Sequence, residues 1–145
     1  RFNKPLDIGT GTGILAFAAW HLFGKPVLAG DNDKDSVRVA RENAVLNGIR
    51  KSVKIVLSDG YRAAAIRNGG PYDLVMANIL ANPLIALAPD LKRNLARNGR
   101  AVLSGLLKTQ ERDVLAAHRA VGLELDFRLR LGEWSVLVLK PGGKR

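Results

Sequence analysis

A glycine-rich run near the start of the sequence has the residue types and spacing of a ligand-binding loop. Residues 7–13 read Asp-Ile-Gly-Thr-Gly-Thr-Gly and continue a short apolar segment that begins at Pro5. Glycine lets the backbone turn tightly and lets a ligand approach closely. The dinucleotide fingerprint G-x-G-x-x-G would need a glycine at position 14, where Ile14 stands. The spacing favours a ligand without a pyrophosphate over a nicotinamide dinucleotide; a structural turn is the alternative.

An acidic residue follows the next apolar run, at the distance expected for a ribose-binding carboxylate. Asp31 stands about 20 positions after Gly9, directly after the run Val27 to Gly30. A carboxylate there can accept hydrogen bonds from both hydroxyls of a ribose. Asp33 is expected to cap the following helix. Asp31 alone fits any nucleoside, but together with the glycine spacing it disfavours a nicotinamide cofactor.

Two more polar sites follow the third and fourth apolar runs. Residues 58–60, Ser-Asp-Gly, could meet an adenine edge or form an ordinary turn. Asn78 is followed by Ile79, and its carboxamide and the Ile79 carbonyl can accept a hydrogen bond from an amine. Leu80 and Leu84 would form an apolar wall that keeps this amine partly desolvated. A strand-end turn is the structural alternative for Asn78, but its place in line with the two earlier strand ends favours binding.

These polar residues end apolar runs that alternate with amphipathic segments. The expected strands are 5–8, 27–30, 53–57, 72–77, 99–104, 123–130 and 134–139. The expected helices are 14–23, 33–47, 61–67, 82–97 (broken near Pro89) and 109–121. Helical crossovers between successive strands predict an α/β fold, with a doubly wound, mostly parallel seven-stranded sheet and a C-terminal antiparallel hairpin. Ligands bind such sheets at the carboxyl ends of the strands, at the switch point.

Several other residues carry structural expectations. Helix 14–23 is apolar nearly all round and is expected to be buried, with His21 packed inside. His118 is expected to face solvent on a late helix. Trp134 is expected in the core or in a cleft wall, and Ser104-Gly105 is a candidate lining segment at the end of the fifth strand.

The composition is that of one globular domain. The 145 residues are 47% hydrophobic and 25% charged, which is enough for a substantial core. The absence of cysteine excludes disulfides, thiolate zinc sites and a cysteine nucleophile, and two distant histidines predict no metal site. With no run of about 18 apolar residues and no leader pattern, we expect no membrane span and a cytoplasmic location. The net charge of +10 favours an anionic partner such as nucleic acid.

Together these motifs resemble the class I S-adenosylmethionine-dependent methyltransferases. Within that group the chain is similar to the methyltransferases of large-subunit ribosomal protein eleven, the PrmA family. The resemblance rests on residues 6–16, 40–44, 47–48, 77–81, 83–84, 87–89, 103–105 and 132–134. The Asn-Ile-Leu-Ala stretch at 78–81 is its most specific part.

The resemblance implies a cofactor, a substrate and roles for individual residues. The cofactor is S-adenosylmethionine, with Gly9 and its neighbours against the methionine part and Asp31 on the ribose. Asn78 lies beside the sulfonium methyl and the incoming amine, as the catalytic residue. The implied cofactor-binding residues are Asp7, Gly9, Thr10, Gly11, Gly13, Asp31, Asn32, Asp59 and Asn78. The implied substrate is the lysine and N-terminal amines of a ribosomal protein, with incidental contact to ribosomal RNA left open.

The resemblance also sets an expected domain organisation. Residues 1–140 would form the cofactor-binding catalytic domain and 141–145 a flexible tail, while the family's N-terminal substrate-recognition domain is absent from this chain. The alternatives are an RNA or small-molecule methyltransferase on the same fold, or a cofactor-binding fragment without activity. The basic balance fits RNA, but Asn78 is not followed by the Pro-Pro-aromatic pattern usual for base amines.

Overall fold

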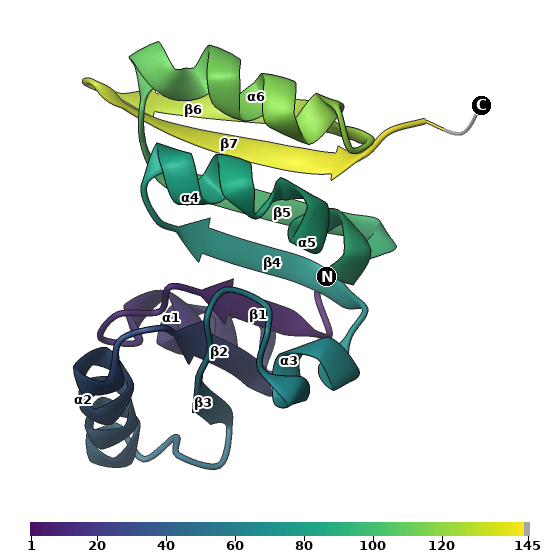
Figure 1. Cartoon of the computed structure of the whole chain (residues 1–145). Coiled ribbons are helices and arrows are strands. Elements are labelled where there is room, and N and C mark those ends of the chain that lie inside the picture. Colours follow the sequence, from purple (N-terminus) through teal and green to yellow (C-terminus); the bar gives the residue numbers. More distant parts are fainter. Residues whose placement is uncertain (144–145) are drawn as a thin grey trace.

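A seven-stranded sheet runs through the protein, whose computed structural model describes residues 1–143 (Figure 1). The strands are β1 (Pro5–Ile8), β2 (Val27–Asp31), β3 (Val53–Leu57), β4 (Tyr72–Asn78), β5 (Leu95–Leu107), β6 (Leu123–Leu131) and β7 (Trp134–Pro141). Their order is β3-β2-β1-β4-β5-β7-β6. Strands β1 to β5 pair in parallel, and β7 is antiparallel to both β5 and β6. The predicted fold class is confirmed.

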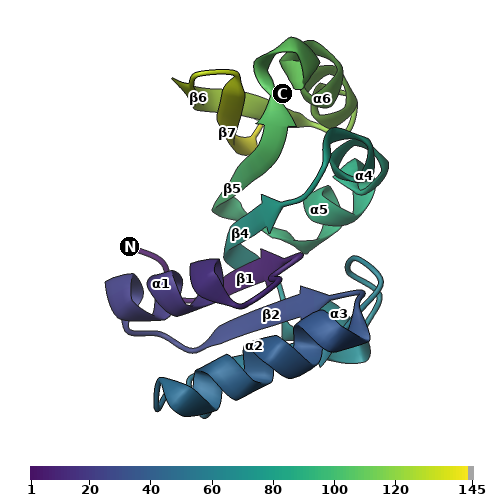
Figure 2. The same ribbon diagram turned by 90° about the vertical axis from the view of Figure 1, so that its left-hand side faces the viewer.

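Helices cover both faces of the sheet (Figure 2). They are α1 (Ile14–Phe23), α2 (Lys34–Leu46), α3 (Ala64–Gly69), α4 (Ala81–Ala86), α5 (Ala88–Asn94) and α6 (Glu111–Arg119), with the 3₁₀ turn η1 (Lys108–Gln110). Two apolar clusters result, one on each face. The smaller joins α1 and α2 to β2 and β3, and the larger joins α3 to α6 with β1, β4, β5 and β7. No helix among the described residues is long and apolar enough to cross a membrane.

The helix α2 forms where its sequence pattern predicts it. The Asp33 side chain accepts a hydrogen bond from the Asp35 backbone N–H at 3.3 Å, which caps the helix. Val37, Ala40 and Ala44 recur at helical spacing and are buried against the sheet. The next apolar residue, Val45, is 58% exposed because it lies one residue beyond that stripe.

The predicted helix over 82–97 is instead two short helices and the start of a strand. The break between α4 and α5 falls at Leu87, and Pro89 stands in the first turn of α5, where a missing N–H costs nothing. Strand β5 already begins at Leu95. Pairing of Leu95 with Tyr72 of β4 therefore overrides the helical pattern that continues toward Arg97.

The prediction that helix 14–23 is buried is wrong. Only Ala16 and Ala19 of α1 are buried, whereas Ile14 is 70% and Leu22 is 73% exposed. The two alanines lie in the apolar cluster, and Phe17, Trp20 and Phe23 pack against it half-buried, so only the remaining side of the helix faces outward. His21, expected to be packed, is therefore exposed on the outer side.

The expectations for His118 and Trp134 are also wrong. His118 is 1% exposed, since it continues the stripe by which Val114 of α6 packs on the sheet. Its Nδ1 lies 2.7 Å from the Val114 carbonyl oxygen, and burial lowers the pKa of the imidazole. Trp134 is 55% exposed, because it stands beside the β6–β7 turn rather than in the core.

The C-terminal segment continues the sheet for a few residues. Pro141 pairs with Leu123 of β6, and the Gly142 backbone N–H donates to the Gly122 carbonyl at 2.8 Å. Of the segment 141–145, expected to be a flexible tail, residues 144–145 lie outside the described residues.

Candidate functional site

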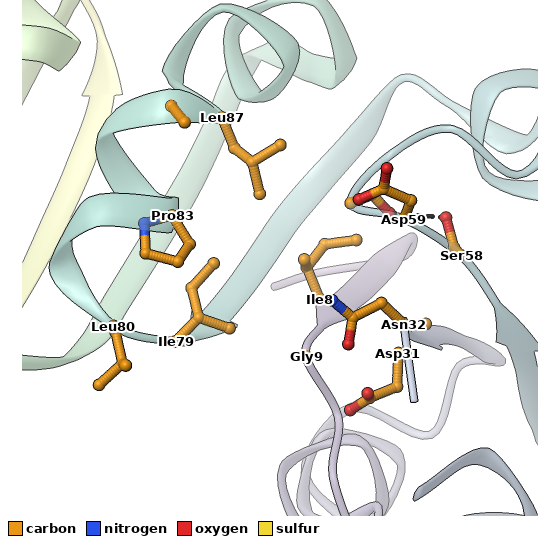
Figure 3. A pocket seen from close by; sticks show the side chains of 13 residues that line it. Ile8, Gly9, Asp31, Asn32, Ser58, Asp59, Ile79, Leu80, Pro83 and Leu87 are labelled. Atoms are coloured by element: carbon orange, nitrogen blue, oxygen red, sulfur yellow. Dashed lines mark hydrogen bonds between the residues drawn. The ribbon is translucent and has the colours of Figure 1, made fainter. Parts of the chain in front are cut away.

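A cavity of about 520 Å³ opens at the carboxyl ends of β1, β2, β3 and β4. It lies beside the junction of β1 and β4, from which the strand order runs outward in both directions, so it occupies the switch point of the sheet. Its lining residues are Ile8, Gly9, Gly30, Asp31, Asn32, Ser58, Asp59, Gly60, Ile79, Leu80, Pro83, Ala86 and Leu87. Figure 3 shows the polar residues on one side and the α4 residues on the other.

Gly9 forms the floor of the cavity, where the loop after β1 passes close to Ile79 at the end of β4. Its φ of +76° lies in the left-handed region, and the backbone N–H groups of Gly9 and Thr10 both donate to the Gly30 carbonyl, at 2.9 and 3.0 Å. A Cβ at position 9 would lie 2.4 Å from Cγ2 of Ile79. Only glycine therefore lets the loop after β1 pass this close to the end of β4.

Asp31 reaches the cavity from the end of β2. Its Oδ2 accepts the Gly11 backbone N–H at 2.8 Å, and its Oδ1 accepts the Asp33 backbone N–H at 3.0 Å. Each carboxylate oxygen carries two lone pairs, so both oxygens keep capacity for one further donor. Asp31 can therefore hold the loop and still accept hydrogen bonds from a pair of ligand hydroxyls.

The loop after β3 supplies the next part of the wall. The Ser58 hydroxyl donates to the Gly60 carbonyl at 2.7 Å and accepts the Ala63 backbone N–H at 3.0 Å, so Ser58 shapes the loop. Asp59 is exposed at the rim, with one carboxylate oxygen 4.0 Å from Nη1 of Arg62. Asn32 lines the cavity beside Asp31.

Asp7 and Thr10 lie beneath the loop rather than in the cavity wall. Asp7 is fully buried; its Oδ2 accepts the Thr10 hydroxyl at 2.7 Å, while its Oδ1 has no hydrogen-bond partner among the described residues. Burial raises the pKa of Asp7 to about 7. Gly11 and Gly13 also stand outside the lining, where Gly13 begins α1 at a φ of +96°. None of these four residues lines the cavity, and the buried Asp7–Thr10 hydrogen bond holds the loop to the end of β1.

Asn78 borders the cavity without lining it. It is exposed at the end of β4, where it pairs with Ser104 of β5. Its chain neighbour Ile79 lines the cavity. A Cβ at Gly105 would lie 2.6 Å from the Ile79 carbonyl oxygen and 2.9 Å from Oδ1 of Asn78, so the β5 backbone passes directly against this turn. Gly105 thus packs beside the cavity mouth rather than lining it.

The structure brings together four of the residues predicted to bind the cofactor: Gly9, Asp31, Asn32 and Asp59. The sequence predicted Leu80 in an apolar wall of the cavity, and the structure confirms this, but sequence reasoning missed Pro83, Ala86 and Leu87. Leu80, Pro83 and Leu87 line one side of the cavity at helical spacing, a pattern visible in the sequence. Leu84, expected in this wall, points the other way and is 2% exposed in the core.

The cavity suits a nucleoside-sized ligand. Its volume falls within the range of about 300–1,000 Å³ typical of small-molecule sites. The Asp31 carboxylate, which can accept further hydrogen bonds, faces the apolar wall of Leu80, Pro83 and Leu87. Gly9 has no side chain, so a ligand can approach the backbone of the loop closely. Among residues 1–143 no group of three or more histidine, aspartate or glutamate side chains could hold a metal ion.

The fold and the position of the cavity define the class: this is the architecture of the S-adenosylmethionine-dependent methyltransferases. A TehB-like SAM-dependent methyltransferase from Corynebacterium glutamicum superposes with a TM-score of 0.76 at 21% identity, over 97% of this chain and 81% of that one. An RNA methyltransferase from Salinibacter ruber, in complex with S-adenosyl-L-homocysteine, gives a TM-score of 0.75 at 20% identity, over 99% of this chain and 84% of that one. At these identities the likeness concerns the fold.

Sequence similarity identifies the family. Residues 2–141 match the model of the ribosomal protein L11 methyltransferase family (PrmA), and the chain belongs to that family. The resemblance inferred from the motifs is thereby confirmed.

Individual relatives agree with this assignment. A ribosomal protein L11 methyltransferase from Bradyrhizobium diazoefficiens is 49% identical over 143 residues, covering 99% of this chain and 48% of that protein. The one from Caulobacter sp. is 44% identical, over 97% and 48%. A crystal structure of ribosomal protein L11 methylase from Lactobacillus delbrueckii gives a TM-score of 0.84 at 36% identity, over 97% of this chain and 70% of that one. The chain spans about half the length of the curated relatives it matches.

Proposed function

We propose that this chain is the cofactor-binding, catalytic part of a protein N-methyltransferase that uses S-adenosylmethionine. Its substrate would be lysine and N-terminal amines of a large-subunit ribosomal protein, which implies action in the cytoplasm. The observation that carries this proposal is the cavity at the switch point, lined by Gly9, Asp31 and Ile79, in a chain that matches the family over residues 2–141. In this assignment residues 1–140 form the catalytic domain.

The proposed cofactor contacts follow from the lining. Asp31 would accept hydrogen bonds from the two ribose hydroxyls, Asn32 and Asp59 would face the polar edges of the nucleoside, and Leu87 would cover the base. Gly9 would pass against the methionine part, while Asp7, Thr10, Gly11 and Gly13 would hold the loop in shape. S-adenosylmethionine, when bound, supplies a methyl group already activated by a sulfonium charge. The protein is then required mainly to position and desolvate the acceptor, and good alignment is worth about 7–11 kcal/mol.

Asn78 is the residue we assign to the acceptor amine. Its exposed carboxamide at the end of β4 can accept a hydrogen bond from an amine N–H, as can the neighbouring Ile79 carbonyl. A lysine amine must first lose its proton, and the apolar Leu80 beside it disfavours the charged form. No residue in the cavity lining is assigned as a base; the proton would pass to water.

A labelled-methyl transfer assay with the intact protein tests this function. Asn78→Ala should lower the transfer rate to ribosomal protein about 10- to 100-fold and leave cofactor affinity, measured by calorimetry, close to the original value. Asn82→Ala, exposed on α4 outside the cavity lining, is the matched control and should keep the full rate. Full activity of Asn78→Ala would remove Asn78 from the site.

The same assay separates the second candidate, an RNA methyltransferase. The net charge of +10 favours it. Label appearing in ribosomal RNA and not in ribosomal protein would overturn the proposed substrate. Cofactor binding with transfer to neither would identify a binding module instead.

A further inference from the structure

A second hollow, of about 430 Å³, lies between α2 and the edge strand β3 and shares no lining residue with the cofactor cavity. Figure 1 shows α2 beside β3 at the outer end of the sheet. We call this hollow the basic groove. Its lining residues are Arg41, Ala44, Val45, Arg50, Lys51, Lys54, Ile55 and Val56.

The basic groove contains cations and no carboxylate. All four of its basic side chains are exposed, and the sequence has no aspartate or glutamate between Glu42 and Asp59. Arg50, Lys51 and Lys54 form no ion pair with any carboxylate of residues 1–143. Like charges gathered in this way repel one another, and an anionic ligand would relieve that repulsion.

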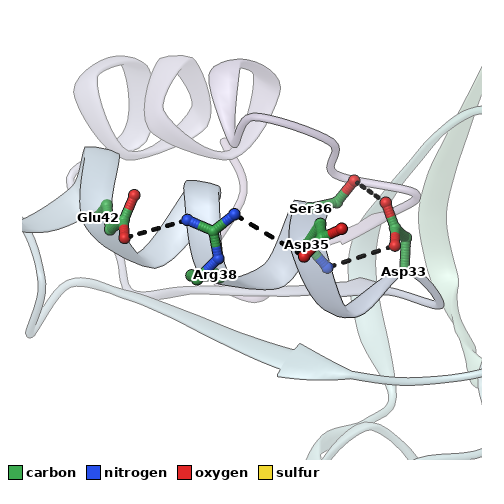
Figure 4. A network of polar contacts seen from close by, with 5 residues as sticks. All are labelled: Asp33, Asp35, Ser36, Arg38 and Glu42. Atoms are coloured by element: carbon green, nitrogen blue, oxygen red, sulfur yellow. Dashed lines mark hydrogen bonds and ion pairs between the residues drawn. The ribbon is translucent and has the colours of Figure 1, made fainter.

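The neighbouring part of α2 is arranged differently. Figure 4 shows Arg38 between two acidic residues of its own helix: its guanidinium lies 3.8 Å from Asp35 and 3.4 Å from Glu42. An adjoining hollow of about 360 Å³, which shares Arg41 with the basic groove, is lined by this neutralised arginine, by Glu42 and by Lys34. The basic groove therefore differs from the adjoining hollow in having no carboxylate in its lining.

Arg41 gives the basic groove a fixed donor. Its Nε and Nη2 donate to the Ile55 carbonyl at 3.0 and 2.8 Å, which holds the guanidinium against the edge of β3. Three of its five N–H donors remain for another acceptor, and a planar guanidinium matches the oxygens of a phosphate. Holding the side chain in advance lowers the entropy lost on binding.

Protection of the sheet edge explains only part of this arrangement. A lysine on an edge strand discourages pairing with another chain, which accounts for Lys54 and for the Arg41 contact to Ile55. Arg50 and Lys51 lie in the turn before β3, where no strand edge is open. Protection of the sheet edge therefore does not account for these two residues.

We propose that the basic groove binds the phosphate backbone of RNA without reading its sequence. Clustered lysine and arginine side chains are the usual partners of phosphates, and such contacts carry no base specificity. The groove is an open surface hollow with small apolar residues between its cations, which suits a chain of evenly spaced charges. This binding needs neither the cofactor nor methyl transfer, so it goes beyond the proposed function.

The test is fluorescence anisotropy of the intact protein with a labelled oligouridylate of about 16 nucleotides at several salt concentrations. The groove variant combines Arg50→Gln, Lys51→Gln and Lys54→Gln, and it keeps Arg41 because that side chain holds the strand edge. The matched control combines Lys108→Gln, Arg112→Gln and Arg119→Gln, which are exposed on and beside α6 and remove the same charge.

The groove variant should bind about tenfold more weakly, with a slope of log affinity against log salt that is shallower by about 2. The control should stay within about threefold of the unchanged protein. Equal weakening of both variants, or no weakening of the groove variant, would overturn the proposal. So would a polyglutamate competitor as effective as RNA, since the groove would then fit an acidic protein. Cofactor affinity of the groove variant, measured by calorimetry, should be unchanged, which separates this outcome from the fate of the methyltransferase assignment.

Discussion

The backbone N–H of Gly11 donates to Oδ2 of Asp31 over 2.8 Å, and this bond ties the glycine-rich loop after β1 to the end of β2. Because the other carboxylate oxygen accepts the Asp33 N–H, one side chain connects three segments that meet at the cavity. Asp31 itself lines that cavity. Loop order and ligand affinity therefore depend on the same carboxylate.

Replacing Asp31 with alanine should lower both quantities. We expect the free energy of unfolding to fall by about 1–3 kcal/mol, because two backbone donors lose a charged acceptor, and cofactor affinity to fall at least about tenfold. Denaturant titration and calorimetry measure the two effects. Asp35→Ala, which removes only an exposed pair with Arg38, should change stability by about 0–1 kcal/mol and leave affinity alone. A loss of stability without a loss of affinity would show that Asp31 does not hold the ligand.

Gly9 and Gly11 form a matched pair for testing the close approach of the loop to β4. Both have positive φ, +76° and +57°, so an alanine at either carries similar backbone strain. Only at Gly9 would the new Cβ meet another side chain, 2.4 Å from Cγ2 of Ile79; at Gly11 nothing lies within 4 Å. Gly9→Ala should therefore destabilise the protein by about 1–3 kcal/mol more than Gly11→Ala, measured by denaturant unfolding.

A double variant checks that cause. Ile79→Ala removes the Cγ2 atom that the new Cβ would meet, so Gly9→Ala should cost less stability in that background than alone. Additive losses would contradict a steric origin and leave backbone strain as the whole effect.

Elements whose pattern is local and regular were predictable from the sequence. Strand β3 and helix α1 have the predicted bounds, since apolar runs flanked by turn residues mark both. The site could be predicted where a polar residue ends a buried strand, as at Asp31. In the apolar wall only Leu80 was predicted, because Pro83 and Leu87 have no chemistry of their own and their helical spacing does not tell which way that face of the helix packs.

The exposure of individual side chains was harder to predict than the bounds of the elements, because it depends on which helices and strands pack against one another. An apolar helix such as α1 was expected inside the core, yet Leu22 faces outward, because the apolar cluster covers only the side of the helix with the alanines and the half-buried aromatic residues. His118 was expected outside, yet it continues the buried stripe of α6. The type of a residue gives its tendency to be buried, and the element that packs against it decides whether it is buried in the fold.

Asp7 should make stability fall as pH rises. Burial raises its pKa from 3.8 to about 7, so the folded protein holds a proton that the unfolded chain has released in that interval. The contribution is fully present below about pH 4, is lost between about pH 4 and 7, and is flat above, amounting to up to about 4 kcal/mol. Asp7→Asn should remove this fall in a pH series of denaturant titrations, and Asp113→Asn, exposed on α6, controls for the change of charge. A fall that persists in Asp7→Asn would assign it to another group.

Glu111 should act in the opposite sense at lower pH. Arg130 donates to both of its carboxylate oxygens, at 3.0 and 2.9 Å, and these hydrogen bonds, with one from Ser135, lower the pKa of Glu111 from 4.5 to about 2 despite its burial. Here the unfolded chain takes up the proton first, so the stabilisation is present above about pH 4.5 and is lost as pH falls toward 2. Glu111→Gln should lower the free energy of unfolding at neutral pH by about 1–3 kcal/mol, and it should reduce the loss of stability as pH falls from about 4.5 toward 2.

Two arginine variants locate the origin of that effect. Arg130→Gln should reduce the loss of stability at low pH more than Arg128→Gln does. Arg128 contributes only one ion pair, at 3.4 Å, whereas Arg130 makes two hydrogen bonds. A pH series of denaturant titrations measures the loss of stability at low pH and the loss toward pH 7 in one experiment. With Glu111 raising stability up to about pH 4.5 and Asp7 lowering it from about pH 4, these two residues together place a maximum between pH 4 and 5. The double variant Asp7→Asn, Glu111→Gln should lose that maximum, and a maximum that survives there would have to come from other groups.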